Sequence, residues 1–291
     1  MLREMNQNFA RPGLSFETGN GGLTRAVIST PLANGEIYLQ GAHVAAWNPV
    51  GEEPVLWLSK QSHFSPGKPI RGGVPICFPW FGPNAADATQ PAHGFARLIE
   101  WQVIATRTKA DGITEIELGT TIGTFKLTYG VEFGSVLKMT LRTEVSTQST
   151  EDQVFEDALH TYLAVSDVRS VLIKGLEAAS YIDKVDQALL RPPSGSPIHF
   201  SGETDRIYLE TISDCVLVDS GIQRSIRISK SGSMSTVIWN PWIEKSKRMP
   251  DFGDDEWAQM ACVETTNVAG NRIKLLPGES HSTTATISVV T

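Results

Sequence analysis

The chain has 291 residues and a formal net charge of −7, with 25 Lys and Arg residues against 32 Asp and Glu residues. Its composition is 41% hydrophobic and 20% charged, which is ordinary for a soluble globular protein. A mildly acidic chain is a poor binder of long polyanions, so nucleic acid is not expected as a partner, although local arginines could still bind one small phosphate.

Apolar and polar residues alternate along much of the chain with a period of two, which is typical of β-strands. The clearest strand is predicted at 136–145, where Leu137 and Met139 point to one face and Lys138 and Thr140 to the other. The strands expected from this pattern, in chain order, are 26–30, 36–40, 100–106, 114–120, 126–133, 136–145, 170–175, 205–210, 215–219, 225–229, 235–240, 272–276 and 284–290.

Turn-forming pairs separate several of these strands, and helical signals are short. The expected turns are Asn34-Gly35, Asp111-Gly112, Ser231-Gly232 and Pro277-Gly278. Only a short helix is expected, near 254–260. Many short strands without a long helix predict an all-β fold, an antiparallel sandwich or barrel. Because no break in composition divides residues 1–291, the chain is expected to form a single domain.

The cysteines and the N-terminal segment bear on cellular location. Cys77, Cys215 and Cys262 stand far apart, are odd in number and include no C-x-x-C pair, which favours structural thiols in a reducing compartment. The first residues lack the apolar region of a secretory signal, and no run approaches the ~18 apolar residues of a membrane span. The protein is therefore expected in the cytoplasm, with no membrane as a partner.

Common cofactor-binding and catalytic motifs are absent from the sequence. It contains no G-x-G-x-x-G, G-x-x-x-x-G-K-[ST] or G-x-S-x-G, which removes the main signals for dinucleotide binding, a P-loop and a serine hydrolase. The six histidines are scattered and no H-E-x-x-H occurs. No cofactor and no metal ligands are predicted, although distant residues could still form a metal site.

An irregular segment at 63–97 is rich in Pro, Gly and aromatic residues and carries two arginines and two histidines. A loop of this length in a compact domain is usually functional. Within IRGGVPICFPWFGP, Arg71 could direct its guanidinium group at an anion or pair with a carboxylate. Within PAHGFAR, His93 and Arg97 could bind a sugar phosphate, or His93 could be an ordinary loop histidine.

Three further polar residues are candidates for acid–base catalysis or for binding a sugar. Alternation in 155–165 puts His160 on one face of a strand, where it could act as a general acid or be a core histidine bonded to backbone. Glu264 stands in the otherwise apolar strand 260–268, where burial would raise its pKa and suit it to base catalysis, unless it forms a strand-end salt bridge. Asp205 could accept hydrogen bonds from sugar hydroxyls or occupy a turn.

Together these motifs resemble the glucose-6-phosphate 1-epimerase family, the hexose-6-phosphate mutarotases of the aldose 1-epimerase superfamily. The resemblance covers residues 40 to about 265 in order and implies the galactose-mutarotase-like β-sandwich. One departure is Ala92, where some family members carry a substrate-binding Gln; Gln90 lies two residues further back. The motifs are QGAHVAAWNP (40–49), EPVLWLS (53–59), IRGGVPICFPWFGP (70–83), PAHGFAR (91–97), ALHTYLAV (158–165), ETDRIY (203–208) and CVET (262–265).

The resemblance also implies a role for each candidate residue. The expected partner is a small sugar phosphate, and the expected assembly is a monomer or a weak homodimer. The implied roles are catalysis for His160 and Glu264, phosphate binding for Arg71 and Arg97, contact with sugar hydroxyls for Asp205, and a position near the sugar ring for His93.

The implied reaction interconverts the α and β anomers of a hexose 6-phosphate, with glucose 6-phosphate the first choice. Opening the ring needs a base, Glu264, to take the proton of the anomeric hydroxyl and an acid, His160, to protonate the ring oxygen. No metal, nucleotide or covalent intermediate is required. Three alternatives stay open: a mutarotase of free aldoses, a non-catalytic sugar-binding protein on the same fold, and a glycosidase using Glu264 and Asp205 as its carboxylates.

Overall fold

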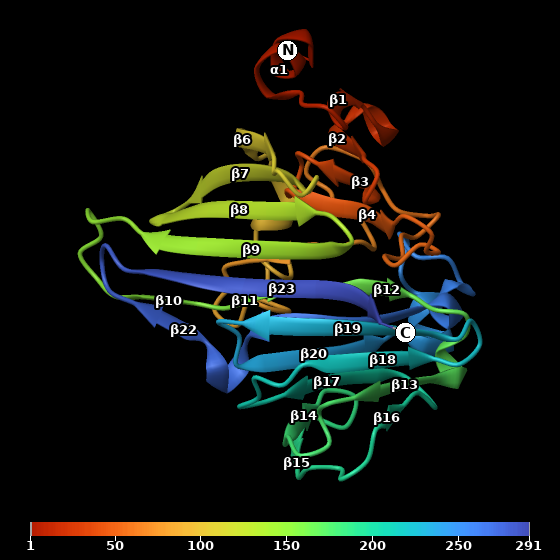
Figure 1. Cartoon of the computed structure of the whole chain (residues 1–291). Coiled ribbons are helices and arrows are strands. Elements are labelled where there is room, and N and C mark those ends of the chain that lie inside the picture. The colour runs from red at the N-terminus through yellow and green to blue at the C-terminus, as the bar shows by residue number, and fades with distance from the viewer. Residues whose placement is uncertain (1, 291) are drawn as a thin grey trace.

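Antiparallel strands are the main regular structure of residues 2–290, the part of the chain that the computed structural model describes (Figure 1). Within these residues the largest sheet has nine strands. From one edge to the other they are β16 (Ile198–His199), β13 (Val171–Lys174), β18 (Cys215–Asp219), β19 (Arg224–Ser231), β23 (Ser280–Val290), β9 (Val136–Val145), β8 (Phe125–Phe133), β7 (Thr114–Ile122) and β6 (Gln102–Thr108).

A second sheet, of eight strands within residues 2–290, carries most of the candidate site. Its strands run β15 (Leu189–Arg191), β14 (Tyr181–Asp183), β17 (Thr204–Tyr208), β20 (Ser235–Asn240), β21 (Met260–Asn267), β11 (Asp157–Leu159) and β5 (Ile76–Cys77), and β12 (Tyr162–Ala164) also pairs with β21. The smaller sheets are β1 (Leu14–Thr18), β2 (Thr24–Ser29), β3 (Ala33–Tyr38) and β4 (His43–Pro49), and the pair β10 (Gln153–Phe155) and β22 (Ile273–Leu275).

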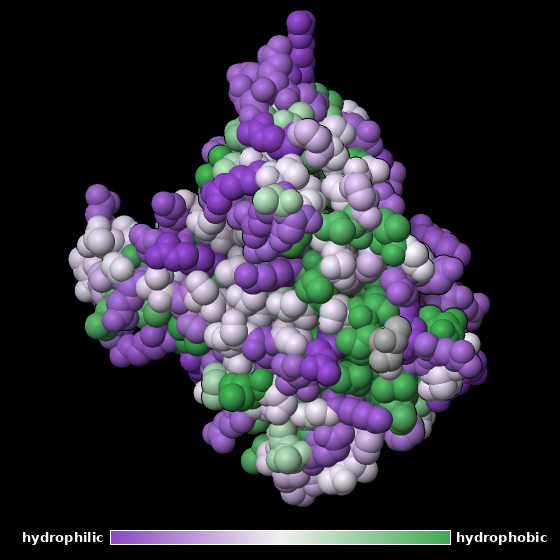
Figure 2. All heavy atoms as spheres, in the orientation of Figure 1, coloured by the Kyte–Doolittle hydropathy of each residue, from purple (hydrophilic) through white to green (hydrophobic). Residues whose placement is uncertain are grey.

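Helices are short. The α-helices are α1 (Leu2–Phe9) and α2 (Trp242–Ser246), and single 3₁₀ turns occur at Asn20–Gly22, Ala96–Leu98, Val168–Ser170, Glu256–Gln259 and Ala269–Asn271. In Figure 2 the projecting N-terminal helix is mostly hydrophilic, and none of its described side chains is buried. Asn6 fastens it to β1 by exchanging two hydrogen bonds with the backbone of Phe16. No helix within residues 2–290 combines the length and the apolar character needed to cross a membrane.

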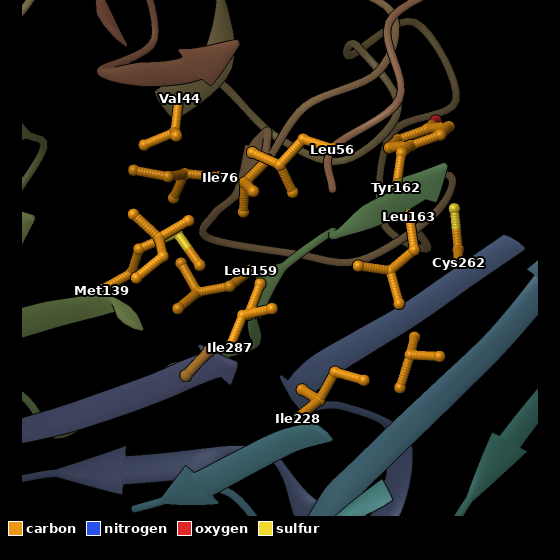
Figure 3. Close-up of a cluster of buried hydrophobic side chains, with 14 of the residues drawn as sticks. Val44, Leu56, Ile76, Met139, Leu159, Tyr162, Leu163, Ile228, Cys262 and Ile287 are labelled. Carbon is orange, nitrogen blue, oxygen red and sulfur yellow. The ribbon is translucent and has the colours of Figure 1, made fainter. Parts of the chain in front are cut away.

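The hydrophobic core lies between the two large sheets. Figure 3 shows Met139, Ile228 and Ile287 of the nine-stranded sheet facing Leu159 and Leu163 of the eight-stranded sheet. Each fully buried side chain of this size stabilises the fold by about 1.5–3 kcal/mol. The alternation that predicted these strands arises because only one face of the nine-stranded sheet meets the core. The predicted all-β antiparallel sandwich is therefore confirmed.

One core contains residues from Leu14 to Ile287, as the expected single domain requires, but the domain assignment stays a prediction. One predicted turn is wrong. Asn34 and Gly35 lie inside β3, paired with both β2 and β4. A Cβ atom on Gly35 would come within 2.6 Å of the Phe133 ring, so glycine serves close packing there rather than a turn.

Candidate active site

A cavity of about 310 Å³ opens beside β17, β20 and β21. Five of the six candidate residues line it, and Arg97 does not. The volume suits a small ligand. A larger depression, about 410 Å³, lies over β6 to β8, but its lining offers only Glu100 and Lys126 as charged groups. The smaller cavity is lined by Arg71, Phe81, Gly82, Pro83, Ala92, His93, His160, Lys184, Asp205, Val237, Trp239, Lys245, Met249 and Glu264.

Strand register brings His160 and Glu264 together. The predicted strand over 155–165 is interrupted at residues 160–161, which separates β11 from β12. Both strands pair with β21 in one continuous antiparallel register, with Leu159 opposite Thr265 and Tyr162 opposite Cys262. That register sets His160 opposite Glu264, and their Nε2 and Oε1 atoms are 3.4 Å apart. Two residues 104 positions apart in sequence thus meet because the strands on both sides of His160 pair with β21.

The surroundings of this pair push the two pKa values apart. Glu264 is 1% exposed, and burial, then the charge of Asp205, raises its pKa well above the usual value, while Lys184 opposes that shift. Burial, followed by the charges of Arg71 and Arg97, lowers the pKa of His160 well below its usual value. Both shifts favour the uncharged arrangement, a protonated carboxyl group beside a neutral imidazole.

Unpaired polar atoms of this pair face the cavity region. Within residues 2–290, neither carboxyl oxygen of Glu264 nor Nδ1 of His160 has a hydrogen-bond partner. A buried polar group without a partner is costly, so a ligand that supplies hydroxyl groups would gain by satisfying them. The imidazole of His160 is held in place by stacking on Tyr162, with ring centroids 4.7 Å apart and planes 10° apart, and by the edge of Trp239.

Arg71 lines the cavity, where it could bind an anion, and it also pairs with a carboxylate, so both contacts expected for it are present. Its guanidinium lines the cavity, and it also donates to Asp251 Oδ2 through Nε at 3.2 Å and to the Tyr162 hydroxyl through Nη1 at 2.9 Å. Burial alone would lower the pKa of Arg71, but the charges of Tyr162 and Asp251 outweigh it and the pKa is raised. Gly72 follows at φ +108°, where a Cβ would come within 2.5 Å of the Leu58 backbone. The loop is therefore rigid at Arg71.

His93 has its tautomer set by the backbone. Its Nδ1 accepts a hydrogen bond from the Gly82 N–H at 3.2 Å, so the ring proton belongs on Nε2. Burial, then the charge of Arg97, lowers the pKa of His93, which keeps the ring neutral. The neutral ring lines the cavity beside His160, with ring centroids 5.8 Å apart, and can donate one hydrogen bond to a ligand oxygen.

Arg97 is not among the residues that line the cavity. Its Nη2 donates to the carbonyl of Ala92, a lining residue, at 2.7 Å. Its buried Nε has no hydrogen-bond partner within residues 2–290, and burial lowers its pKa. The sequence placed Arg97 beside Arg71 as a second anion-binding group. In the structure its charge acts on the same region, since it lowers the pKa of both His93 and His160.

The sequence missed two lysines beside Asp205. Lys184 Nζ lies 3.4 Å and Lys245 Nζ 3.8 Å from Asp205 Oδ2, and Lys245 also pairs with Glu203 at 2.7 Å. Burial raises the pKa of Asp205, while both lysines oppose that shift. Lys184 follows β14 directly and Lys245 lies on α2. Only the pairing of β14 with β17 and of β17 with β20 reveals that they converge, so no local motif could have identified them.

One set of side chains could hold a metal ion. A ring nitrogen of His160, the sulfur of Cys262 and a carboxylate oxygen of Glu264 all lie within 4.8 Å of one another. All three residues are buried. Sequence spacing gave no sign of this group because the histidine comes from a distant segment, between β11 and β12.

The chain is similar to proteins of known sequence and structure. The family model described as aldose 1-epimerase matches residues 28–288, which include all six candidate residues. An Escherichia coli K12 protein named "Putative glucose-6-phosphate 1-epimerase" is 36% identical over 249 residues, or 82% of this chain and 81% of its own length. A Cenchrus ciliaris protein of the same name is 33% identical over 270 residues, covering 88% and 81%. The crystal structure of a "putative mutarotase" from Salmonella typhimurium matches with a TM-score of 0.89 and 31% identity, covering 97% of this chain and 95% of that one.

Proposed function

This chain belongs to the aldose 1-epimerase family, and on that premise we propose that it interconverts the anomers of a hexose 6-phosphate, glucose 6-phosphate first. Family membership makes it an isomerase rather than a non-catalytic sugar-binding protein or a glycosidase. The names of the curated relatives point to the phosphorylated substrate.

The observation that carries the phosphorylated substrate is the charge of the cavity. Arg71, Lys184 and Lys245 line it against the carboxyl groups of Asp205 and Glu264, and the raised pKa of Glu264 favours its neutral form. Asp251 and Glu203 pair with Arg71 and Lys245 but do not line the cavity, so the lining groups carry more positive than negative charge, which favours an anionic ligand. In the proposed complex Arg71 contacts the phosphate, and Arg97 adds its charge from behind Ala92.

The His160–Glu264 pair supports the acid–base chemistry. Once the proton passes from Glu264 to His160, the carboxylate takes the proton of the anomeric hydroxyl and the imidazolium protonates the ring oxygen. The C1–O5 bond breaks as the C1=O bond forms. The open aldehyde then turns about C1–C2, and the two groups exchange roles as the ring closes. Each positioned acid or base typically contributes about 10²–10⁴-fold to the rate.

Other lining residues would hold the sugar while C1 turns. His93 can donate from Nε2, Asp205 can accept from two hydroxyl groups, and the Trp239 ring offers a flat apolar surface. Holding the rest of the ring still converts the step into a rotation of one carbon within a fixed frame. The two lysines that contact Asp205 favour its charged form and oppose the effect of burial on its pKa.

The test is anomer exchange followed by NMR, with glucose 6-phosphate and galactose at equal concentration. Faster exchange of the phosphosugar alone is expected. Glu264→Gln should lose this acceleration while keeping the fold, and near-normal rates would remove Glu264 as the base. Arg97→Ala should raise KM for the phosphosugar far more than for a free sugar. Acceleration of galactose alone would favour a free-aldose mutarotase and refute the phosphate assignment.

A further inference from the structure

We propose that His160, Cys262 and Glu264 form a binding site for a zinc ion, and that zinc bound there inhibits the enzyme. The binding stands on the geometry alone, whereas the inhibition rests on the proposed function. Zn²⁺ takes histidine nitrogen, cysteine sulfur and carboxylate oxygen as ligands, at about 2.0–2.3 Å. The three ligand atoms lie within 4.8 Å of one another, each from a buried side chain.

The distances fit a tetrahedral ion with a small adjustment. Tetrahedral bonds of that length separate neighbouring ligand atoms by about 3.4–3.7 Å. His160 Nε2 and Glu264 Oε1 are already 3.4 Å apart. The longest separation in the group, up to 4.8 Å, needs to shorten by about 1 Å, which a modest rotation of the Cys262 or Glu264 side chain supplies.

The backbone presets this arrangement. Cys262 and Glu264 are two residues apart on β21, so their side chains share one face of the sheet. The neighbouring register positions His160 opposite Glu264 and Tyr162 opposite Cys262. Both Glu264 oxygens lack a hydrogen-bond partner within residues 2–290, so the carboxylate has free coordinating positions. Two of the ligands therefore come from β21, and the third, His160, lies in the two-residue break between β11 and β12, which both pair with β21.

The ligands and the neighbouring charged residues together determine how well the site would accept a zinc ion. A thiolate and a carboxylate would neutralise Zn²⁺. His160 and Glu264 line the cavity, so water or a sugar hydroxyl there could supply a fourth ligand. Because zinc binds the deprotonated thiol and carboxyl group, binding displaces any protons that they carry. Arg71 and Lys184 oppose the cation, while Asp205 favours it. The charge of Arg97 lowers the pKa of His160, and Cys77 raises that of Cys262.

A bound ion would occupy the two groups that move protons. With zinc on the His160 nitrogen and the Glu264 carboxylate, neither group can accept or deliver a proton, and ring opening stops. The structural cost is low because the ion replaces an unsatisfied carboxyl group with a coordinated one. A metal ion bound there would therefore inhibit a reaction whose proposed acid–base steps use no metal.

The first experiment measures binding without any substrate. The reduced full-length protein is titrated with Zn²⁺ and, separately, with Co²⁺, whose thiolate complexes show a charge-transfer absorption. Wild type is compared with Cys262→Ala and with Cys215→Ala, which removes a buried thiol on β18 of the other sheet. We expect one zinc per chain in wild type and Cys215→Ala, and binding weaker by at least about 10-fold in Cys262→Ala, since even the loss of an outer-shell partner costs 10–100-fold.

The cobalt absorption should be present in wild type and Cys215→Ala and absent in Cys262→Ala. Equal zinc affinity in Cys262→Ala, or cobalt binding without the thiolate absorption, would overturn the site. Cys262→Ser, which keeps the volume, replaces the alanine variant if that variant does not fold.

The second experiment compares the anomer-exchange rate of each variant with and without zinc. Zinc should slow wild type and Cys215→Ala and slow Cys262→Ala far less, and a chelator should restore the lost rate. Equal inhibition of all three would place the inhibitory ion elsewhere and refute the proposal. A wild-type protein that shows the cobalt thiolate absorption but accelerates no sugar would refute the proposed function and leave the metal site standing.

Discussion

His43 should make the fold sensitive to acid. It opens β4, its side chain is 1% exposed, and its Nε2 has no hydrogen-bond partner within residues 2–290. Burial lowers the pKa of His43 from 6.5 to about 3, with the charge of Arg97 adding to the shift and a Gly72 backbone hydrogen bond opposing it. In the unfolded chain the same imidazole regains its ordinary pKa. Between the two pKa values, His43 therefore binds a proton in the unfolded state and stays neutral in the folded state.

The size of the effect follows from the two pKa values. Stability contributed by neutral His43 is complete above pH 6.5 and falls as the pH drops towards about 3. Each pH unit in that window costs about 1.4 kcal/mol. A pH of 4.5 lies about two units below the pKa of 6.5 that the imidazole has in the unfolded chain. His43 alone should therefore remove about 2.7 kcal/mol of the free energy of unfolding at that pH.

The assay is urea unfolding at pH 7 and pH 4.5 for wild type, His43→Gln and His63→Gln. His63 is exposed and serves as the matched control. The loss of unfolding free energy between the two pH values should be about 2–3 kcal/mol smaller in His43→Gln than in wild type, and unchanged in His63→Gln. Other titrating groups contribute equally to all three proteins and cancel.

An acid sensitivity of His43→Gln equal to that of wild type would refute the reasoning. If the variant does not fold, an NMR titration of the His43 ring in wild type decides the matter. A pKa near 6.5 would contradict the burial argument, and a value near 3 would support it.

Two further predictions concern the site. The rate of anomer exchange above the spontaneous rate should follow a bell-shaped pH profile. The rate should fall on the acid side with a pKa below 6.5, because His160 and Glu264 are then both protonated. It should fall on the alkaline side with a pKa above 4.5, because Glu264 has then lost the proton that the pair shares. A monotonic profile would contradict the shared proton. Asp251→Asn should loosen Arg71 and raise KM for glucose 6-phosphate by about 10-fold, roughly one charge-assisted hydrogen bond. Asp254→Asn, at an exposed position, should leave KM unchanged. Equal KM values in the two variants would refute a role for Asp251 in substrate binding.

The strands that sequence predicted best belong to the nine-stranded sheet. β8 and β9 show the period of two clearly, because one face meets the core and the other meets water. β21 is buried on both faces, and its first four residues, 260–263, are all apolar. Glu264 stood out for that reason: a carboxyl group in a doubly buried strand is an exception that packing alone does not explain.

The parts of the site that sequence did not predict depend on pairing between distant strands. Asp251 reaches Arg71 across 180 positions, and Lys184 and Lys245 reach Asp205 from two different elements. None of these residues lies in a recognisable motif. The implied role of Arg97 in phosphate binding stays a prediction: its Nη2 donates to the Ala92 carbonyl, and its side chain is not among those that line the cavity.

The same features explain why this site can be both stable and reactive. A neutral imidazole and a protonated carboxyl group can be buried together more cheaply than two charges, so the fold tolerates His160 and Glu264 inside the sheet. A sugar that hydrogen-bonds the unpaired oxygens favours the charged arrangement in which the proton has crossed 3.4 Å to the imidazole. The resting form is therefore the one that packing prefers, and the reactive form is the one that the ligand prefers. A surface pair, solvated in both arrangements, would lack this dependence on the ligand.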